Sequence, residues 1–455
     1  MMLRILFAGS LLLSAPVLNS ATKVDGKPFN ASILDLAKQG YVEEEFFLAG
    51  TARTYDIPRD QMSNGTPADA THPYKTRLVV RRPATPAKFN GTVVVEWTNV
   101  SEGFDNEVEW FHSGEHFVRS GYAWVGVSAQ NVGVTALKQR MGDRYSSLDV
   151  TDNGTVTGDG LSYDIFAAAG QAVRGKSGLN ILGPLKAERV IASGHSQSAG
   201  RLATYFNAVH PLTPVYDAVV LHGGGGKMRT DLNVKIWKLL SETDVLGQVA
   251  VRQPDSDKFR TWEVAGVSHL DYTHAMQLVK LGLRTKETML PTPGPGPARG
   301  GNQTPGPFNG CNHPPLSRVP GEYVQNALYD HMTRWVKDGT PPPAAPPIEI
   351  ITENGGKPAI DRDSFGNALG GIRLAEHAVP VAVNSGENTG TGFCFLTGWH
   401  EDFDKQRLGM LYSSHQSYVS DVKGATDRNL KAGYIVKADA LKSVANAEQS
   451  SVGAK

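Results

Sequence analysis

The chain has 455 residues, of which 40% are hydrophobic and 20% are charged. These proportions are typical of a globular protein and exclude a disordered or fibrous one. The 45 basic residues equal the 45 acidic ones and form no long block of like charge, so nothing in the composition supports nucleic-acid binding.

The N-terminus has the pattern of a secretory signal peptide. Arg4 precedes a mostly apolar stretch, residues 5–18, and small residues follow at Ser20 and Ala21. This stretch is shorter than the roughly 20 residues that cross a bilayer. We therefore expect a signal peptide over residues 1–21 and a secreted or periplasmic protein without a membrane span. A single N-terminal anchor is the alternative.

Strand-like runs rich in β-branched and aromatic residues alternate with helical patterns. This alternation predicts an α/β fold with a mostly parallel central sheet flanked by helices. The apolar run at residues 93–95 is typical of a strand that is buried on both faces. The predicted strands are residues 77–82, 92–98, 122–128, 188–193, 216–222, 234–240 and 259–265. The predicted helices between them include residues 107–119, 163–173 and 198–209.

Two segments interrupt this alternation. Residues 140–160 are rich in Asp, Gly, Thr and Ser, and residues 285–318 contain a long Pro- and Gly-rich stretch. We expect both to be surface loops, and both are candidates for a lid. After a predicted helix over residues 320–337, the tail is expected to pack on the core. The sequence thus predicts a single domain over residues 22–455, with loop insertions and a C-terminal elaboration.

The cysteines are Cys311 and Cys394. In an oxidising compartment they are expected to form one disulfide that closes a long loop. Two free, buried thiols are the alternative. The distance between them in the sequence does not fit a zinc ribbon or a redox motif.

The segment GHSQSAG, residues 194–200, follows a predicted strand and precedes a predicted helix. A strand, a sharp turn bearing Ser and then a helix form the context of a nucleophile elbow, which predicts Ser196 as a nucleophile. Gly194 is small, as that turn requires, whereas Ser198 replaces the usual second Gly. The helix N-terminus directs N–H groups at a developing oxyanion, so the Gln197 N–H is the first expected donor. A Gly- and Ser-rich turn without a catalytic role is the alternative.

The partners of such a serine are expected further along the chain, in the order acid and then histidine. Glu242 and Asp244 follow one predicted strand, and His269 follows the next. Both groups therefore fall at the carboxyl edge of the sheet, beside the Ser turn. We expect His269 to act as general base and Asp244 to orient it, because Asp244 lies deeper in the loop. Glu242 is the alternative acid.

The second oxyanion donor is expected in the turn after the predicted strand 92–98, at the backbone of Asn99 or Val100. The run HGGGG at residues 222–226 resembles an oxyanion motif. It follows the nucleophile instead of preceding it, so its position contradicts that role. These glycines are expected to let the backbone pass close to the site.

Several further segments, together with the Ser turn, resemble the α/β-hydrolase domain group of secreted bacterial esterase-like proteins. The segments are GTVVVEW at 91–97, GHSQSAGRL at 194–202, RQPDSD at 252–257, WEVAG at 262–266, GTPP at 339–342 and GNALGGIR at 366–373. The resemblance covers most of the mature chain. It implies an α/β-hydrolase fold and hydrolysis of carboxylic esters, small or polymeric, without a cofactor and through an acyl-enzyme on Ser196. A lipase or polyester depolymerase of the same mechanism is the alternative, because this fold hosts many chemistries.

A rival hypothesis rests on the sequence H-x-x-E-H, which begins at His112. On a helix, His112 and His116 would share a face and could bind zinc while Glu115 acted as a base. No third ligand is evident, so no metal is expected. A non-catalytic binding protein on a hydrolase scaffold is the remaining alternative.

Overall fold

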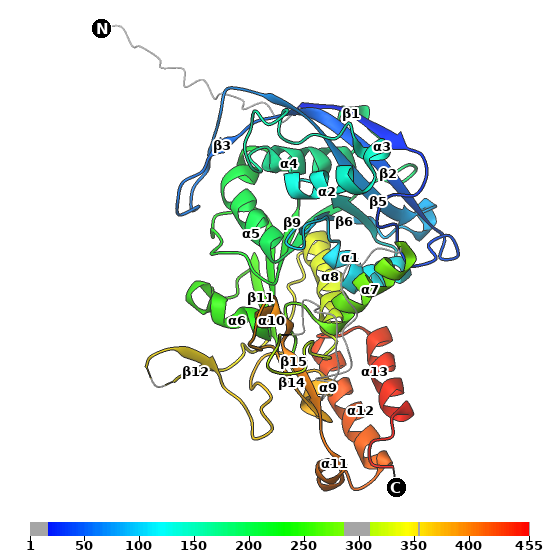
Figure 1. Ribbon diagram of the computed structural model, residues 1–455, viewed down its shortest axis with the longest axis vertical. Helices are drawn as coiled ribbons and strands as arrows, with labels where there is room; N and C mark the ends of the chain where they lie inside the picture. Colours follow the sequence, from blue (N-terminus) through cyan, green and yellow to red (C-terminus); the bar gives the residue numbers. More distant parts are fainter. Residues whose placement is uncertain (1–16, 286–309, 354, 455) are drawn as a thin grey trace.

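The computed structural model describes residues 17–285, 310–353 and 355–454 (Figure 1). Its main feature is a nine-stranded sheet in the order β1-β2-β5-β7-β6-β8-β9-β10-β11. From β7 to β11 neighbouring strands run parallel, whereas β1, β2 and β5 pair antiparallel at one end. The strands are β1 Val17–Val24, β2 Tyr41–Ala52, β5 His72–Pro83, β6 Thr92–Trp97, β7 Ala123–Val127, β8 Arg189–His195, β9 Ala218–His222, β10 Lys235–Ser241 and β11 Phe259–Val264.

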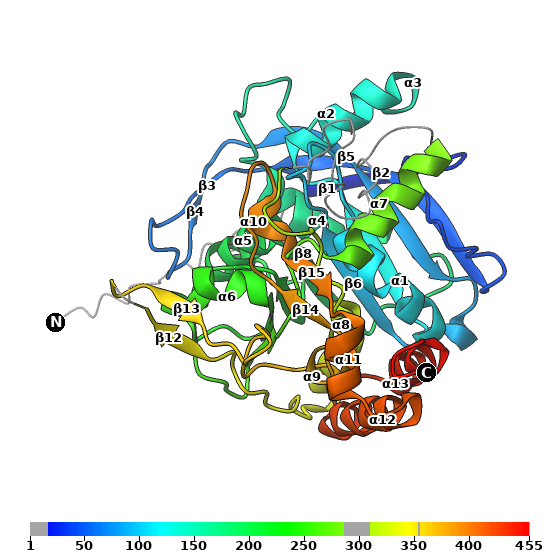
Figure 2. The same ribbon diagram turned by 60° about the horizontal axis from the view of Figure 1, so that its bottom comes forward.

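Helices cover both faces of this sheet (Figures 1 and 2). Successive side chains of a strand point to opposite faces. Accordingly, the Glu96 carboxylate of β6 accepts a hydrogen bond from a backbone N–H of α1 on one face. On the other face the ring of Trp97 packs against Phe166 of α4, with the ring centroids 4.9 Å apart. Every residue of β6 is buried, as the apolar run predicted. The helices up to residue 285 are α1 Val108–Ser120, α2 Asn131–Arg140, α3 Gly142–Tyr145, α4 Ser162–Val173, α5 Gln197–Thr204, α6 Glu242–Gln248 and α7 Tyr272–Thr285.

The C-terminal part adds one helix to the core and several elements beyond it. Helix α8 packs against α1, where Phe117 and Tyr329 have ring centroids 4.8 Å apart. Several of the remaining helices share a small apolar core of their own that includes Tyr412, Tyr418 and Val422. The elements are α8 Gly321–Asp338, β12 Ile350–Thr352, β13 Pro358–Ile360, α9 Ala375–Ala378, β14 Ala382–Ser385, α10 Cys394–Thr397, β15 Trp399–Asp402, α11 Lys405–Leu411, α12 His415–Ala432 and α13 Lys437–Gln449.

The predicted α/β class is confirmed, and the structure adds details that the pattern did not give. Residues 17–21 of the predicted leader form the first part of β1 and pair with β2. Part of the first predicted lid loop is helical, in α3, and residues 286–309 of the second lie outside the described residues. None of the helices in the described residues is long and apolar enough to cross a membrane.

Candidate active site

Ser196 lies in the sharp turn between β8 and α5. Its backbone has φ 60° and ψ −118°, a left-handed conformation that is unusual for a residue with a side chain. The Ser196 N–H donates to the carbonyl oxygen of His222 over 2.8 Å, which fixes the turn against β9. A Cβ atom at Gly194 would lie 3.1 Å from that of Ser198. The position two before Ser196 therefore has to be small, as expected for a nucleophile elbow.

Ser198 replaces the second glycine of the usual motif and makes a contact that glycine could not. Its hydroxyl donates to the carbonyl oxygen of Thr98 over 3.1 Å. Thr98 directly follows β6, so this bond ties the first turn of α5 to the carboxyl end of the neighbouring strand. The departure from the motif thus adds a connection across the site.

His269 is hydrogen-bonded to both expected partners. Its Nε2 lies 2.8 Å from Ser196 Oγ, and its Nδ1 lies 2.6 Å from Asp244 Oδ1. Ionised Asp244 can only accept, so Nδ1 carries the proton and Nε2 is free to accept from the serine hydroxyl. The backbone N–H of His269 donates to Thr243 Oγ1 over 3.1 Å, which holds the loop beside α6.

Asp244 stands in the first turn of α6, a helix that begins directly after β10, and not deep in a loop as expected. Its Oδ2 accepts from both the N–H and the hydroxyl of Ser241, over 2.8 and 2.6 Å. Burial favours the neutral acid, but His269 and the two Ser241 bonds outweigh it and lower the pKa of Asp244. The carboxylate is therefore charged and fixed in orientation.

Glu242, the alternative acid, makes no hydrogen bond or ion pair with His269, and its partners in the described residues are other groups. It is buried and accepts from the backbone N–H groups of Gly266 and Gly386, and Arg362 pairs with it over 2.8 Å. These contacts join the first residue of α6 to the loop after β11 and to the C-terminal elaboration. Glu242 therefore holds neighbouring segments together, whereas Asp244 is the acid that is hydrogen-bonded to the His269 imidazole.

The backbone N–H groups that were expected to bind the oxyanion are not all free of other hydrogen bonds. Gln197 is the first residue of α5, so its N–H has no acceptor within the helix. The Asn99 N–H is engaged, because it donates to Asn106 over 3.0 Å. Asn99 is therefore not the expected backbone donor, and its side chain instead donates to the His195 carbonyl over 2.9 Å. In the described part of the chain the Val100 N–H has no acceptor, which leaves Gln197 and Val100.

A cluster of histidines behind His269 was not predicted. The ring centroid of His195 lies 4.4 Å from that of His269 and 4.5 Å from that of His222. His222 in turn pairs over 3.0 Å with Glu109, a fully buried carboxylate of α1. The ring centroid of His274 lies 6.4 Å from that of His195. The cluster joins the Ser turn, the end of β9 and the segment that runs from His269 into α7, and only the folded structure shows that their rings meet.

The H-x-x-E-H sequence lies on α1, as expected, but does not form a metal site. His112 has both ring nitrogens engaged, Nδ1 with the Val108 carbonyl at 3.0 Å and Nε2 with Asp271 at 3.2 Å. His116 pairs with Asp330 instead, over 3.0 Å. Within the described ranges, no group of three or more His, Cys, Asp or Glu side chains is arranged to hold a metal ion. The geometry therefore contradicts the zinc hypothesis.

Cys311 and Cys394 are joined by a disulfide. Cys394 begins α10, and two residues later the Leu396 carbonyl accepts from the N–H of Leu270 over 2.8 Å. Leu270 directly follows His269. The disulfide therefore fastens a segment that supports the loop carrying the imidazole.

Comparison with known proteins shows the family to which the chain belongs. The esterase LipA from Xanthomonas oryzae, which degrades rice cell walls, is 12% identical over 46% of this chain and 50% of LipA, with a TM-score of 0.25. The α/β serine hydrolase XC6422 from Xanthomonas campestris, described as having no lid, is 13% identical over 52% of this chain and 93% of its own, with a TM-score of 0.29. A search of curated proteins found no match. The alpha/beta hydrolase domain family matches residues 13–445, and the chain therefore belongs to that family.

Proposed function

We propose that the protein is a serine hydrolase that cleaves carboxylic esters through an acyl-enzyme on Ser196. The observation that carries this proposal is the continuous hydrogen-bonded series from Ser196 through His269 to Asp244. It begins at a strained serine on a turn between strand and helix. Nucleophile, base and orienting acid are the three parts that such chemistry requires.

The first half of the reaction follows from this arrangement. His269 Nε2 takes the hydroxyl proton as Ser196 Oγ attacks the ester carbonyl, and Asp244 stabilises the imidazolium that forms. The negative charge that develops on the carbonyl oxygen is met by the N–H groups of Gln197 and Val100. The imidazolium then gives its proton to the leaving alcohol, and the acyl group remains on Ser196.

The second half repeats these steps with water. His269 removes a proton from water as the water oxygen attacks the acyl carbon. The tetrahedral intermediate collapses, the carboxylic acid leaves and Ser196 regains its proton from His269. The groups of this chain thus account for every proton transfer in ester hydrolysis.

The proposal also covers the localisation of the protein and its range of substrates. The predicted leader and the Cys311–Cys394 disulfide support export to an oxidising compartment, outside the cell or in the periplasm. Both small and polymeric esters are candidate substrates. Turnover of short p-nitrophenyl esters compared with triacylglycerol emulsions and polyester films would separate an esterase from a lipase or depolymerase.

The decisive experiment is intact-mass analysis after treatment with a fluorophosphonate probe, with hydrolysis of p-nitrophenyl acetate and butyrate measured in parallel. We expect one label per chain and loss of turnover, both absent from Ser196→Ala and reduced by several orders of magnitude in His269→Ala. A folded wild-type protein that neither reacts with the probe nor turns over any ester would contradict the proposal and favour a non-catalytic scaffold.

A further inference from the structure

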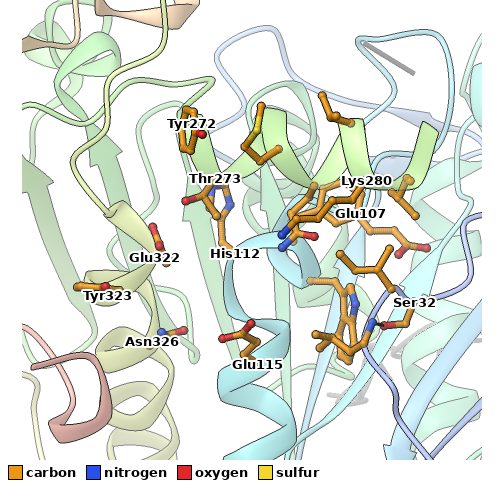
Figure 3. Close-up of a pocket in the computed structure, with 18 of the residues that line it drawn as sticks. Ser32, Glu107, His112, Glu115, Tyr272, Thr273, Lys280, Glu322, Tyr323 and Asn326 are labelled. Carbon is orange, nitrogen blue, oxygen red and sulfur yellow. Dashed lines mark hydrogen bonds between the residues drawn. The ribbon is translucent and has the colours of Figure 1, made fainter. Parts of the chain in front are cut away.

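Two of the cavities in the described part of the chain have volumes within the roughly 300–1,000 Å³ that is usual for small-molecule sites. The first, of about 410 Å³, lies between α1, α7 and α8 (Figure 3). No proposed catalytic residue lines it, and its lining holds charges of both signs, including Glu322 and Lys280. The second, of about 490 Å³, is an open groove lined in part by Gln197, which directly follows Ser196. Of the two, the groove is therefore the one that can receive part of an ester bound at Ser196.

Helix α5 and residues 57–61 form the two walls of this groove. Gln197, Arg201 and Thr204 are spaced four and three residues apart, so they lie on one face of α5. From the other wall, Gln61 Oε1 accepts from Thr204 Oγ1 over 2.8 Å, which joins the walls at the end away from Gln197. Because an α-helix rises about 1.5 Å per residue, Arg201 lies about 6 Å along the groove from Gln197. A substrate group that reaches Arg201 is therefore a short chain away from the reacting carbonyl.

The charged residues that line the groove are Arg59 and Arg201, and both are cationic. Arg59 is exposed and makes no ion pair or hydrogen bond with any of the described residues. The carboxylates of the same segment, Asp56 and Asp60, are outside the lining, and Asp60 Oδ1 already accepts from the Met62 N–H over 3.1 Å. The guanidinium group of Arg59 is therefore available to a ligand.

Arg201 is held by one carboxylate and keeps part of its guanidinium group open. Its Nη2 donates to Asp159 Oδ2 over 3.0 Å, whereas no described residue accepts from its Nε or Nη1. The Asp159 carboxylate also accepts from the Gln130 side chain and from the Asn131 N–H, each over 2.9 Å. The Arg201 side chain is 34% exposed, so its open N–H groups can be reached from the groove. Two guanidinium groups thus meet one shared carboxylate, and the groove has an excess of positive charge.

The neutral side chains of the groove add hydrogen-bond donors. Gln61 Oε1 is already bonded to the Thr204 hydroxyl, and Gln197 Oε1 lies 3.4 Å from another hydroxyl, that of Ser198. The Nε2 groups of both glutamines have no acceptor among the described residues, and neither does the Tyr163 hydroxyl, which also lines the groove. Donors therefore outnumber free acceptors among the lining side chains. Such a lining favours a ligand group that is negatively charged and only accepts hydrogen bonds.

We propose that this groove selects esters that carry a carboxylate, on either the acyl or the alcohol part, and that Arg59 and Arg201 donate to it. A guanidinium group binds the two coplanar oxygens of a carboxylate with parallel N–H groups. Ile57 and Pro58 line the same groove and give the intervening carbon chain an apolar contact. This role rests on the proposed ester hydrolysis and names a substrate class for the same site. The two arginines bind the substrate and take no part in proton transfer.

The test compares two pairs of esters, and the members of each pair differ in charge. Mono-4-nitrophenyl adipate has its free carboxylate on the acyl part, at a distance that suits the spacing of Gln197 and Arg201. Its partner is the same compound with that carboxylate as a methyl ester. In the second pair, 4-acetoxyphenylacetate and its methyl ester, the carboxylate is on the alcohol part. In at least one pair the wild-type chain should have a kcat/KM about tenfold higher for the charged ester, mainly through a lower KM.

Variants of the two arginines then assign the preference to the groove. Arg59→Gln and Arg201→Gln should each lower the ratio of kcat/KM for the charged ester to that for the neutral ester by about threefold, as expected for an exposed ion pair. The double variant should show no preference. Arg428→Gln, which changes an exposed arginine of α12 outside the groove, is the matched control and should keep the wild-type ratio. If loss of the Asp159 contact prevents Arg201→Gln from folding, Arg59→Gln decides alone, because Arg59 is exposed.

Two outcomes would overturn the role of the groove alone. The wild-type chain could hydrolyse the charged and the neutral ester equally well in both pairs, or a preference for the charged ester could persist unchanged in Arg59→Gln and in the double variant. Fluorophosphonate labelling of Ser196 and turnover of the neutral esters are measured on the same preparation. Absence of both would contradict the hydrolase proposal itself, and with it the role of the groove. Their presence without a charge preference would contradict only the substrate class.

Discussion

The imidazole rings of His195 and His269 lie with their centroids 4.4 Å apart and their planes inclined by 39°. His195 is buried, and its ring makes no hydrogen bond to any of the described residues. Burial and then the neighbouring histidines hold the pKa of His195 well below its usual value, so the ring is neutral. A Cβ atom at Gly223 would lie 2.9 Å from His195 Nε2 and 3.2 Å from His269 Cε1. The glycine thus lets the backbone pass beneath both rings, and His195 forms a wall that limits rotation of His269.

His195→Ala should lower kcat by about tenfold or more and leave KM within twofold, because loss of the wall allows His269 to leave its reacting orientation. His195→Phe keeps a flat ring and should recover most of the rate. The pair is compared by steady-state hydrolysis of p-nitrophenyl butyrate between pH 5 and pH 9. Equal rates for His195→Ala and the wild type would refute the positioning role. An impaired His195→Phe would mean that the ring nitrogens themselves are required.

Asp244→Asn and Glu242→Gln should separate an orienting acid from a structural one. Asp244→Asn should lower kcat by roughly three to four orders of magnitude with little loss of stability, because an amide no longer fixes the tautomer of His269. Glu242→Gln should retain most of the rate but lose about 1–3 kcal/mol in the free energy of unfolding, since Arg362 and two backbone N–H groups lose their charged acceptor. Urea unfolding and kcat measured on both variants decide the matter. The reverse pattern would make Glu242 the acid.

Ser198 offers a graded test of its hydrogen bond to Thr98. Ser198→Ala removes that bond and the longer contact of the same hydroxyl with Gln197 Oε1 at 3.4 Å, and it should cost about 1 kcal/mol of unfolding free energy. Ser198→Gly restores the usual motif but adds the cost of glycine in a helix, for a total of about 2 kcal/mol. Both variants should keep the rate within a few fold, because the turn still accommodates them. Activity lost by more than tenfold in Ser198→Ala would show that the hydroxyl contributes to the reaction as well as to the fold.

The sequence predicted the parts of this protein that depend on apolar patterns and local motifs. The runs that became β6 and β8 are apolar because these strands are buried on both faces. Ser196 directly follows β8, and His269 lies in the loop after β11. Strand β2 was missed because it contains three consecutive glutamates that look like surface residues. They are instead buried or half-buried against arginines of β5, an interaction that no hydrophobic pattern reveals. The pairs are Glu43–Arg81, Glu44–Arg82 and Glu45–Arg77, each at 2.6 Å.

The sequence predicted which residues form the candidate site, but it did not predict the local structure around them or their contacts. Asp244 was preferred as a loop residue, whereas it stands in the first turn of a helix capped by Ser241. The Asn99 N–H is not free to bind an oxyanion because it donates to the Asn106 carbonyl, and this hydrogen bond exists only in the folded turn. The ring contacts of His195 join segments far apart in the chain. Such contacts arise from tertiary packing and have no local signature.

The Cys311–Cys394 disulfide should matter for stability and, through α10, for activity. It closes a loop with a sequence separation of 83 residues, for which a chain-entropy estimate gives about 4.5 kcal/mol. The double variant Cys311→Ser, Cys394→Ser should lose stability of that order and some activity, because Leu396 supports the residue after His269. Thermal unfolding and kcat are measured with and without dithiothreitol. A wild-type protein whose melting temperature and kcat do not respond to full reduction would contradict both effects.

The buried His112–Asp271 pair should make stability fall on the alkaline side. Burial disfavours the imidazolium, but Asp271 outweighs it and raises the pKa of His112 to about 9. A raised pKa in the folded state means that the stabilisation is fully present below the unfolded value of about 6.5 and is lost as pH rises through 9. The free energy of unfolding of the wild type, measured with urea, should therefore fall by about 3 kcal/mol between pH 6 and pH 9.5 relative to that of His112→Gln, which has no proton to release at this position. Parallel pH dependences of the two proteins would show that His112 is neutral in the folded state and that the pair is only a hydrogen bond.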